Sequence, residues 1–257
     1  MPIAIVTFCV GADYKRAMEP GLESKRQYAK RHGYDIHIGG EDVWDRTRPI
    51  PWSKLRFIQK YLDSYDYLFV SDADVVILDQ TKRLEVLIHA LLPKNKDILW
   101  TLDACNNYNN GNMFIRGKNT WVRDFFPRVY EQTDVIHHIW WDNAGMIRLF
   151  ETNSDDASHI ETTKSHWLIN AYLFGPDNLA NTTKSVRLYQ QGDFLIHFAG
   201  VYDIWNIYRM MKYVLLQTSE NKPIHVDILD KWRKSPPCDK QDANKSLEIH
   251  IVNKSYS

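Results

Sequence analysis

Residues 67–78, YLFVSDADVVIL, place two carboxylates in the middle of an apolar stretch. The flanking segments, Tyr67–Val70 and Val75–Leu78, have the character of a buried strand. An ionised carboxylate in such surroundings is costly unless it is paired or coordinates a cation. In a strand, residues i and i+2 point to the same face, so Asp72 and Asp74 can both reach one cation. The stretch predicts a buried strand with a cation site at its end; the alternative is a solvated turn in which an Asp caps the backbone.

Strands and helices alternate over about the first 100 residues. Apolar segments at Ile3–Val10 and 34–38 predict strands, and helical spacing predicts helices at Leu22–His32, ending at Gly33, and at 52–65. Further helices are expected at 83–93, 120–132, 140–150 and 203–217, and further strands at 97–103, 111–117, 166–172 and 192–198. This order predicts an α/β fold with a mostly parallel sheet. In such sheets ligands bind outside the carboxyl ends of the strands, where Asp72 and Asp74 fall.

The composition is that of an ordinary globular protein. Among 257 residues, Lys+Arg and Asp+Glu both number 32, so nothing points to nucleic acid or to an anionic membrane surface. No apolar run approaches the roughly 20 residues of a membrane span, and the short apolar N-terminus predicts a strand and not a signal peptide. Cys9, Cys105 and Cys238 are far apart in the sequence, which predicts free thiols in a reducing compartment. We expect one domain over residues 1–221 and a polar tail or wrap-around arm over 222–257.

His197 is a polar residue inside a second apolar stretch, DFLIHF. An imidazole from a neighbouring strand would complete a mixed Asp/His ligand set, which suits Mn²⁺, with Mg²⁺ as the other hard cation. The alternative is a core histidine bonded to the backbone. The motif therefore adds a candidate third ligand to Asp72 and Asp74.

Three further segments carry candidate site residues. Asn109 and Gly111 precede a predicted strand, where Asn can bind hydroxyl groups and Gly allows close approach, although a tight turn uses the same residues. Asp142 follows two tryptophans at a predicted helix start, either as a helix cap or as a carboxylate facing a reactive sugar carbon. Lys54 could meet a phosphate or be a surface charge. The aromatic content of 13% allows for sugar stacking, although most of these residues should be core.

Taken in order, these stretches resemble glycosyltransferase family 34, the galactosyl-, mannosyl- and xylosyltransferases of the GMA12/MNN10 type. The similarity covers roughly residues 3–203. The matching stretches are KRQYAKRHGYD (25–35), PWSKL (51–55), SDADVVI (71–77), NNGNMFIR (109–116), WWDNAGM (140–146) and GDFLIHFAGV (192–201).

The resemblance implies a GT-A fold with a Rossmann-like sheet, a nucleotide-sugar donor, a Mn²⁺ cofactor and retention of anomeric configuration. The implied metal ligands are Asp72, Asp74 and His197, and the implied catalytic carboxylate is Asp142. The implied donor-binding residues are Thr7, Phe8, Lys54, Asp72, Ala73, Asn109, Gly111, Asn143 and Gly200. Retention can arise through a covalent intermediate on Asp142 or through attack on the face that the phosphate leaves, and the sequence leaves both routes open.

Departures from the family pattern bear on specificity. Asn143 stands where the family usually has Gln, and Tyr202 where plant members carry a Lys that meets the diphosphate. We expect a UDP-sugar donor carrying galactose, glucose or xylose, with GDP-mannose as the alternative, and an oligosaccharide or glycoprotein glycan as acceptor. Golgi members also have an N-terminal membrane anchor and stem, and we expect neither here. We therefore expect a cytoplasmic enzyme, as in a bacterium or a large virus, or a trimmed Golgi-type enzyme.

Two other function classes remain. A non-haem iron oxygenase needs two histidines and a carboxylate, and the nearest H-x-D pair, His225 and Asp227, lies in the polar tail. A non-catalytic carbohydrate-binding module would explain the aromatic residues. Such a module has no need of buried acids like Asp72 and Asp74.

Overall fold

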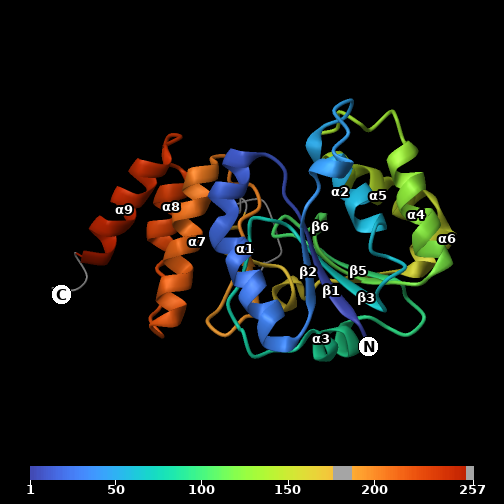
Figure 1. Ribbon diagram of the computed structural model, residues 1–257, viewed down its shortest axis with the longest axis horizontal. Coiled ribbons are helices and arrows are strands. Elements are labelled where there is room, and N and C mark those ends of the chain that lie inside the picture. Colours follow the sequence, from blue (N-terminus) through green and yellow to red (C-terminus); the bar gives the residue numbers. More distant parts are fainter. Residues whose placement is uncertain (176–186, 253–257) are drawn as a thin grey trace.

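A six-stranded sheet runs through the middle of the molecule (Figure 1). The computed structural model describes residues 1–175 and 187–252. The large sheet has the order β2-β1-β3-β6-β5-β7, and a three-stranded sheet has the order β4-β9-β8. The strands are β1 (Ile3–Phe8), β2 (Asp35–Gly39), β3 (Tyr67–Ser71), β4 (Val75–Ile77), β5 (Ile98–Leu102), β6 (Tyr108–Arg116), β7 (Ile160–Thr163), β8 (Ala171–Tyr172) and β9 (Leu195–His197).

Strand β6 is the antiparallel member of an otherwise parallel large sheet. It pairs antiparallel with β3 and β5, whereas the pairs β1–β2, β1–β3 and β5–β7 are parallel. The prediction of a mostly parallel α/β sheet is therefore confirmed. Because β6 runs the other way, its first residues lie beside the carboxyl ends of β3 and β5, with Ser71 opposite Asn112 and Leu102 opposite Tyr108.

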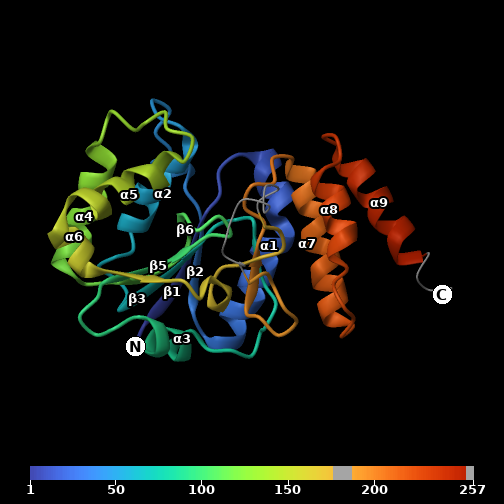
Figure 2. The same cartoon turned by 180° about the vertical axis from the view of Figure 1, so that it is seen from behind.

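Helices cover both faces of this sheet (Figures 1 and 2). They are α1 (Ala12–His32), α2 (Ser53–Gln59), α3 (Leu84–Leu91), α4 (Thr120–Glu131), α5 (Trp141–Thr152), α6 (Ser154–His159), α7 (Ile204–Ser219), α8 (Val226–Arg233) and α9 (Lys240–Val252). Short 3₁₀ turns lie at Glu41–Val43, Ile50–Trp52 and His166–Leu168. Helices α2, α4, α5 and α6 lie on one side, and α1 with α7–α9 on the other. None of the helices in the described part of the chain has the length and apolar character to span a membrane.

Alternation along β1 shows how the sheet separates two apolar clusters. Ala4 and Val6 belong to the cluster under α2 and α4, while Ile3 and Ile5 belong to the cluster that includes residues of α1 and α3. All four side chains are buried. Successive side chains of a strand point to opposite faces, so a strand apolar at every position must be covered on both sides.

Helices α7–α9 form a further layer on α1. Met18 of α1, Met210 of α7, Leu229 of α8 and Ala243 of α9 are buried in one apolar cluster. The described part of the predicted tail is therefore largely helical, and residues 253–257 lie outside the described residues. The division of the chain after residue 221 stays a prediction.

Two helix predictions had wrong boundaries. Helix α1 starts at Ala12, ten residues before the predicted start at Leu22, and continues through Pro20 and Gly21. An added Cβ at Gly21 would lie 2.7 Å from two backbone oxygens of the segment that enters β4, so the helix needs a glycine there. Helix α2 ends at Gln59 and not near 65, because the chain then turns to pair with the segment after β6. The predicted stop at Gly33, which has φ 73°, is confirmed.

The strand predictions needed three corrections. Residues 166–172 form a 3₁₀ turn followed by only two strand residues, because backbone bonds such as Asn170 N–H to the His166 carbonyl hold a turn. Strand β6 begins at Tyr108, so Asn109 and Gly111 lie inside the strand and not in a loop before it. Helix α6 and strand β7 were not predicted; β7 extends the sheet by pairing with β5.

Lys25 is a fully buried lysine on the inner face of α1. Its Nζ donates a hydrogen bond of 2.6 Å to the Val75 carbonyl. Burial lowers the pKa of Lys25 to about 7, although Asp74 and Asp72 act in the opposite direction. The amino group therefore ties the first helix to the strand that follows the two acids, at the cost of burying a cation.

We expect Lys25→Met to be more stable than the wild type at pH 7. A lysine with a lower pKa in the folded state binds fewer protons there than in the unfolded chain between about pH 7 and 10.5. Wild-type stability therefore rises with pH in this window relative to the Met variant. Urea unfolding should show the gap shrinking by about 1 kcal/mol or more between pH 7 and pH 10.

Lys30→Met is the matched control, since Lys30 is an exposed lysine of the same helix. It should change stability by less than about 0.5 kcal/mol. A gap between Lys25→Met and wild type that stays constant with pH would contradict the burial argument.

Candidate active site

Asp72 and Asp74 lie in the turn between β3 and β4, so the expectation that they share a strand face was wrong. Backbone hydrogen bonds fix the turn from two sides. The Asp72 N–H donates to the Gly111 carbonyl at 2.7 Å, and the Asp74 carbonyl accepts from the Phe198 N–H at 3.0 Å. The turn is thus held between β6 and the end of β9, with Ala73 buried beneath it.

His197 joins the two acids from β9. Strands β4 and β9 pair antiparallel, and this register places Val75 opposite His197. The Nε2 atom of His197 lies 3.4 Å from Asp74 Oδ1. One ligand atom from each of Asp72, Asp74 and His197 lies within 4.8 Å of the other two. The three predicted metal ligands are therefore brought together.

Burial and charge act in opposite directions on the two acids. Burial raises the pKa of Asp72 above its ordinary value. Burial also acts to raise the pKa of Asp74, but His197, with help from Lys25, outweighs it and holds that pKa below its ordinary value. The group thus brings two carboxylates together in a partly buried turn, an arrangement that a cation would stabilise.

The residues present fit a divalent cation. Two atoms on opposite sides of one Mg²⁺ are about 4 Å apart, since each lies about 2.0–2.1 Å from the metal. A spread of 4.8 Å among free ligand atoms is therefore close to a binding arrangement. Two carboxylates and an imidazole form a donor set suited to Mn²⁺. Among the described residues, these are the His, Cys, Asp or Glu side chains that come close enough together in a group of three to hold a metal ion. His225 and Asp227, the pair considered for iron, are not part of such a group.

Gly111 leaves the space that this group occupies. A Cβ at Gly111 would lie 2.3 Å from His197 Cε1, 2.8 Å from Asn109 Oδ1 and 3.1 Å from Asp72 Oδ2. Real Cβ atoms essentially never make contacts below 3.0 Å, so a larger residue at this position requires His197 and Asn109, or the strand itself, to shift. The predicted importance of Gly111 therefore has a geometric cause, the close approach of β6 to the metal group.

Lys54 links the metal group to Asp142. Its Nζ lies 3.2 Å from Asp72 Oδ1, 3.3 Å from Asp142 Oδ2 and 3.1 Å from Asn110 Oδ1. Burial acts to lower the pKa of Lys54, but Asp142 and Asp72 outweigh it and hold the pKa above its ordinary value. Lys54 is therefore a buried cation shared by two carboxylates, and not a surface charge.

Asp142 is the second residue of α5 and does not cap the helix. It is 3% exposed, and its Oδ2 accepts a 2.7 Å hydrogen bond from Asn110 Nδ2 in addition to the Lys54 contact. A buried carboxylate held by an amide and an ammonium group is a fixed negative charge next to the metal group.

For three other predicted donor-binding residues, the contacts we describe are with neighbouring protein groups. Asn143 uses both ends of its amide on β6, since Oδ1 accepts from the Asn110 N–H and Nδ2 donates to the Tyr108 carbonyl. Thr7 is fully buried at the end of β1, and Phe8 packs on Phe57. Their roles in donor binding stay predictions.

Gly200 is exposed and has φ 78°, a conformation that favours glycine. Its place after β9 is consistent with a loop near the metal group, and its contact with the donor also stays a prediction.

Two residues of this site were missed from the sequence. Asn110 was noted in the sequence only beside Asn109 and Gly111, either to bind hydroxyl groups or to form a tight turn, yet it bonds both Lys54 and Asp142. Asn170, in the segment predicted as a strand, is fully buried and bonds His197. The sequence signal for Asn170 was an amide side chain inside an apolar stretch, WLINAY. That pattern suggests a buried polar residue but does not indicate which residues it bonds.

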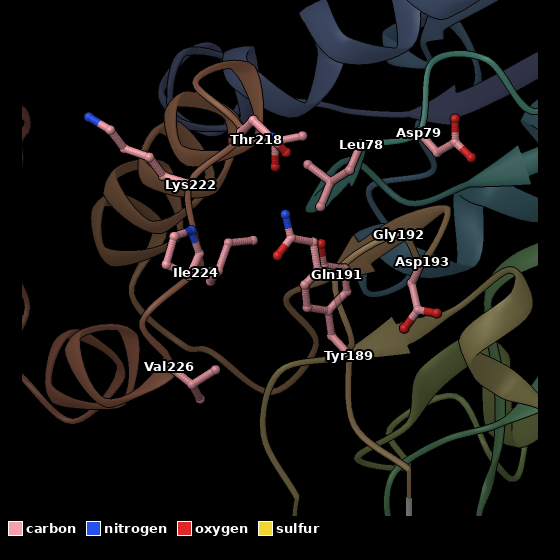
Figure 3. A pocket seen from close by; sticks show the side chains of 12 residues that line it. Leu78, Asp79, Tyr189, Gln191, Gly192, Asp193, Thr218, Lys222, Ile224 and Val226 are labelled. Atoms are coloured by element: carbon pink, nitrogen blue, oxygen red, sulfur yellow. The ribbon is translucent and has the colours of Figure 1, made fainter.

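A separate cavity of about 380 Å³ lies at the other end of the β4–β9 pair (Figure 3). Leu78 and Asp79 line it after β4, and Gly192 and Asp193 line it before β9. Because the two strands are antiparallel and His197 ends β9, the cavity and the metal group lie at opposite ends of the ladder. In Figure 3 the amino group of Lys222 points away from the cavity.

Gly111→Ala should weaken Mn²⁺ binding by about tenfold or more, because the added methyl group displaces the His197 ring. Mn²⁺ titration followed by electron paramagnetic resonance measures this. Gly145→Ala is the control for steric strain, since its methyl group would also lie too close to a side chain, 2.9 Å from the Trp52 ring, but meets no metal ligand among its nearest atoms. Equal affinity of Gly111→Ala and wild type would contradict the assignment.

Lys54→Met should lower the free energy of unfolding by about 3–5 kcal/mol, because it leaves two carboxylates without their shared cation. The double variant Lys54→Met with Asp142→Asn removes one of these charges and should recover much of the loss. Urea unfolding of the single and double variants tests this. A single variant as stable as wild type, or a double variant no better than the single, would mean that the cluster is not held by this charge pairing.

Comparison with known proteins supports the predicted family. The model of the galactosyl transferase GMA12/MNN10 family matches residues 3–122. This stretch contains Lys54, Asp72, Asp74 and Gly111. No curated protein sequence matches the chain significantly.

Several solved structures share the fold. A glycosyltransferase involved in the glycosylation of the major capsid of PBCV-1 matches with a TM-score of 0.63 and 11% identity, over 82% of this chain and 99% of its own. GlyE of Streptococcus pneumoniae TIGR4 matches with a TM-score of 0.54 and 11% identity, over 99% of this chain and 64% of its own. The bifunctional glycosyltransferase WbbM matches with a TM-score of 0.52 and 13% identity, over 86% of this chain and 51% of its own. Residues 3–122 thus match the model of glycosyltransferase family 34, and the structure has a GT-A glycosyltransferase fold.

Proposed function

We propose that the protein is a retaining, metal-dependent glycosyltransferase that moves a hexose or pentose from a nucleotide sugar to a glycan. The observation that carries the proposal is the convergence of Asp72, Asp74 and His197 in one group next to the carboxyl end of β3. Ligands of such sheets bind at this edge.

Asp72, Asp74 and His197 would hold the cation, for which we propose Mn²⁺, with Mg²⁺ as the second choice. When bound, it would supply Lewis-acid neutralisation of the leaving diphosphate. We propose a UDP-sugar donor, carrying galactose, glucose or xylose. GDP-mannose is the competing donor.

We propose that Asp142 acts as a fixed negative charge and not as a nucleophile. Its Oδ2 already bonds Lys54 and Asn110, and such partners lower the reactivity of a carboxylate. Positive charge that develops on the sugar would be stabilised by this prearranged anion. The acceptor would then attack on the face that the phosphate leaves, which retains the configuration.

Exposed tryptophans support a glycan acceptor near Asp142. Trp140 and Trp141, which directly precede Asp142, are 42% and 44% exposed. Trp141 has φ 44°, an unusual value for a bulky residue, and such strain concentrates at functional sites. We propose that their faces stack on a pyranose ring of the acceptor.

We also propose a cytoplasmic location, since Cys9, Cys105 and Cys238 are free thiols. Unpaired cysteines are usual in reducing compartments.

The test is nucleotide release from a panel of UDP- and GDP-sugars with Mn²⁺ and with EDTA. We expect slow, Mn²⁺-dependent hydrolysis of one or two donors. Asp74→Asn should abolish release and metal-dependent UDP binding, whereas Asp142→Asn should lower release at least about 100-fold and keep UDP binding, as expected when an electrostatic group is lost. UDP binding without release from any donor would favour a non-catalytic nucleotide-binding protein instead.

A further inference from the structure

Asn170, in the turn before β8, uses every hydrogen-bonding position of its side-chain amide. Its Nδ2 donates to Thr101 Oγ1 at 2.9 Å and to Asn109 Oδ1 at 3.0 Å. Its Oδ1 faces Asn112 Nδ2 at 2.8 Å and His197 Nδ1 at 2.8 Å. An amide offers two donors and two acceptor positions, so the side chain is saturated, and it is fully buried.

A backbone group fixes which way this amide points. The Gly111 N–H can only donate, and it lies 2.9 Å from Asn109 Oδ1, which must therefore be the oxygen. That oxygen also meets Asn170, which must present its NH₂ group there. The Asn170 oxygen then faces His197 Nδ1. Since a carbonyl oxygen can only accept, Nδ1 must carry a proton.

We propose that Asn170 is a positioning residue that keeps a proton on His197 Nδ1 and leaves Nε2 as the metal-binding nitrogen. The use of Nε2 for a metal rests on the proposed function; the proton position on Nδ1 does not. The nitrogen that binds a metal is set by the hydrogen bond of the other nitrogen, and losing such a bond typically costs 10–100-fold in metal affinity.

One competing contact opposes this arrangement. Asp74 Oδ1 lies 3.4 Å from Nε2 and would attract a proton there. An ordinary N–H···O bond is about 2.7–3.2 Å long, so the 2.8 Å contact with Asn170 is the stronger of the two. Removing the Asn170 oxygen reverses the balance, and the proton of the neutral ring moves to Nε2. A metal must then displace that proton.

Nitrogen-15 NMR of histidine-labelled, metal-free protein at pH 8 tests the proton position directly. We expect an Nδ1–H on His197 in the wild type. Asn170→Leu should shift the proton to Nε2. Asn112→Ala is the matched control, since it removes another buried hydrogen-bond partner of Asn170 and leaves the hydrogen bond between Asn170 and His197 in place.

Mn²⁺ titration by electron paramagnetic resonance gives the second readout. Asn170→Leu should bind Mn²⁺ about 10–100-fold more weakly than wild type, and Asn112→Ala should stay within about threefold. A role in packing alone would affect both variants alike.

A wild-type His197 with a bare Nδ1 overturns the proposal, and this measurement needs no variant to fold. An unchanged proton position in Asn170→Leu overturns it as well. Failure of the wild type to bind Mn²⁺ would instead contradict the proposed function, while the proton position would remain as the spectrum shows it.

Discussion

The close approach of β6 to the turn that carries Asp72 and Asp74 is the constraint on which the site depends. Gly111 allows this close approach through its carbonyl group, its N–H and its lack of a side chain. Its carbonyl accepts from the Asp72 N–H, its N–H fixes the amide of Asn109, and its missing side chain leaves room for His197. Because β6 is antiparallel within a parallel sheet, its first residues reach the edge where the parallel strands end.

Charge compensation is the second requirement of the same site. Asp72, Asp74 and Asp142 gather at one edge of the sheet, and buried lysines from two helices approach them. Lys54 contacts Asp72 and Asp142, and Lys25 bonds the carbonyl of the residue after Asp74. Buried charges of this kind stabilise little by themselves and lower stability strongly when one partner is removed. Such a cluster of fixed charges is suited to binding a charged ligand.

The sequence predicts those features that depend on local pattern. Asp72 and Asp74 were identified as an acid pair inside an apolar run, and His197 as a histidine inside another. The alternation of strand-like and helix-like apolar patterns predicted the sheet. What the sequence could not show depends on contacts distant along the chain. The sequence does not show that Lys25 is buried, because its burial depends on the packing of α1 against β4.

Asn170 and the start of α1 illustrate the same limit. The role of Asn170 needs the positions of Thr101, Asn109 and His197, which lie on three different strands. The start of α1 was set too late because a Pro-Gly pair normally ends a helix. Here Gly21 is required for the helix to pass close to a strand, so tertiary packing overrides the local preference.

The most direct test is a crystal structure with Mn²⁺ and UDP, with the metal located by its anomalous scattering. We expect one strong peak about 2 Å from a carboxylate oxygen of Asp72, from one of Asp74 and from His197 Nε2. The diphosphate should complete the coordination shell. Ordered UDP with no anomalous peak at these residues, or a metal bound through His197 Nδ1, would contradict this expectation.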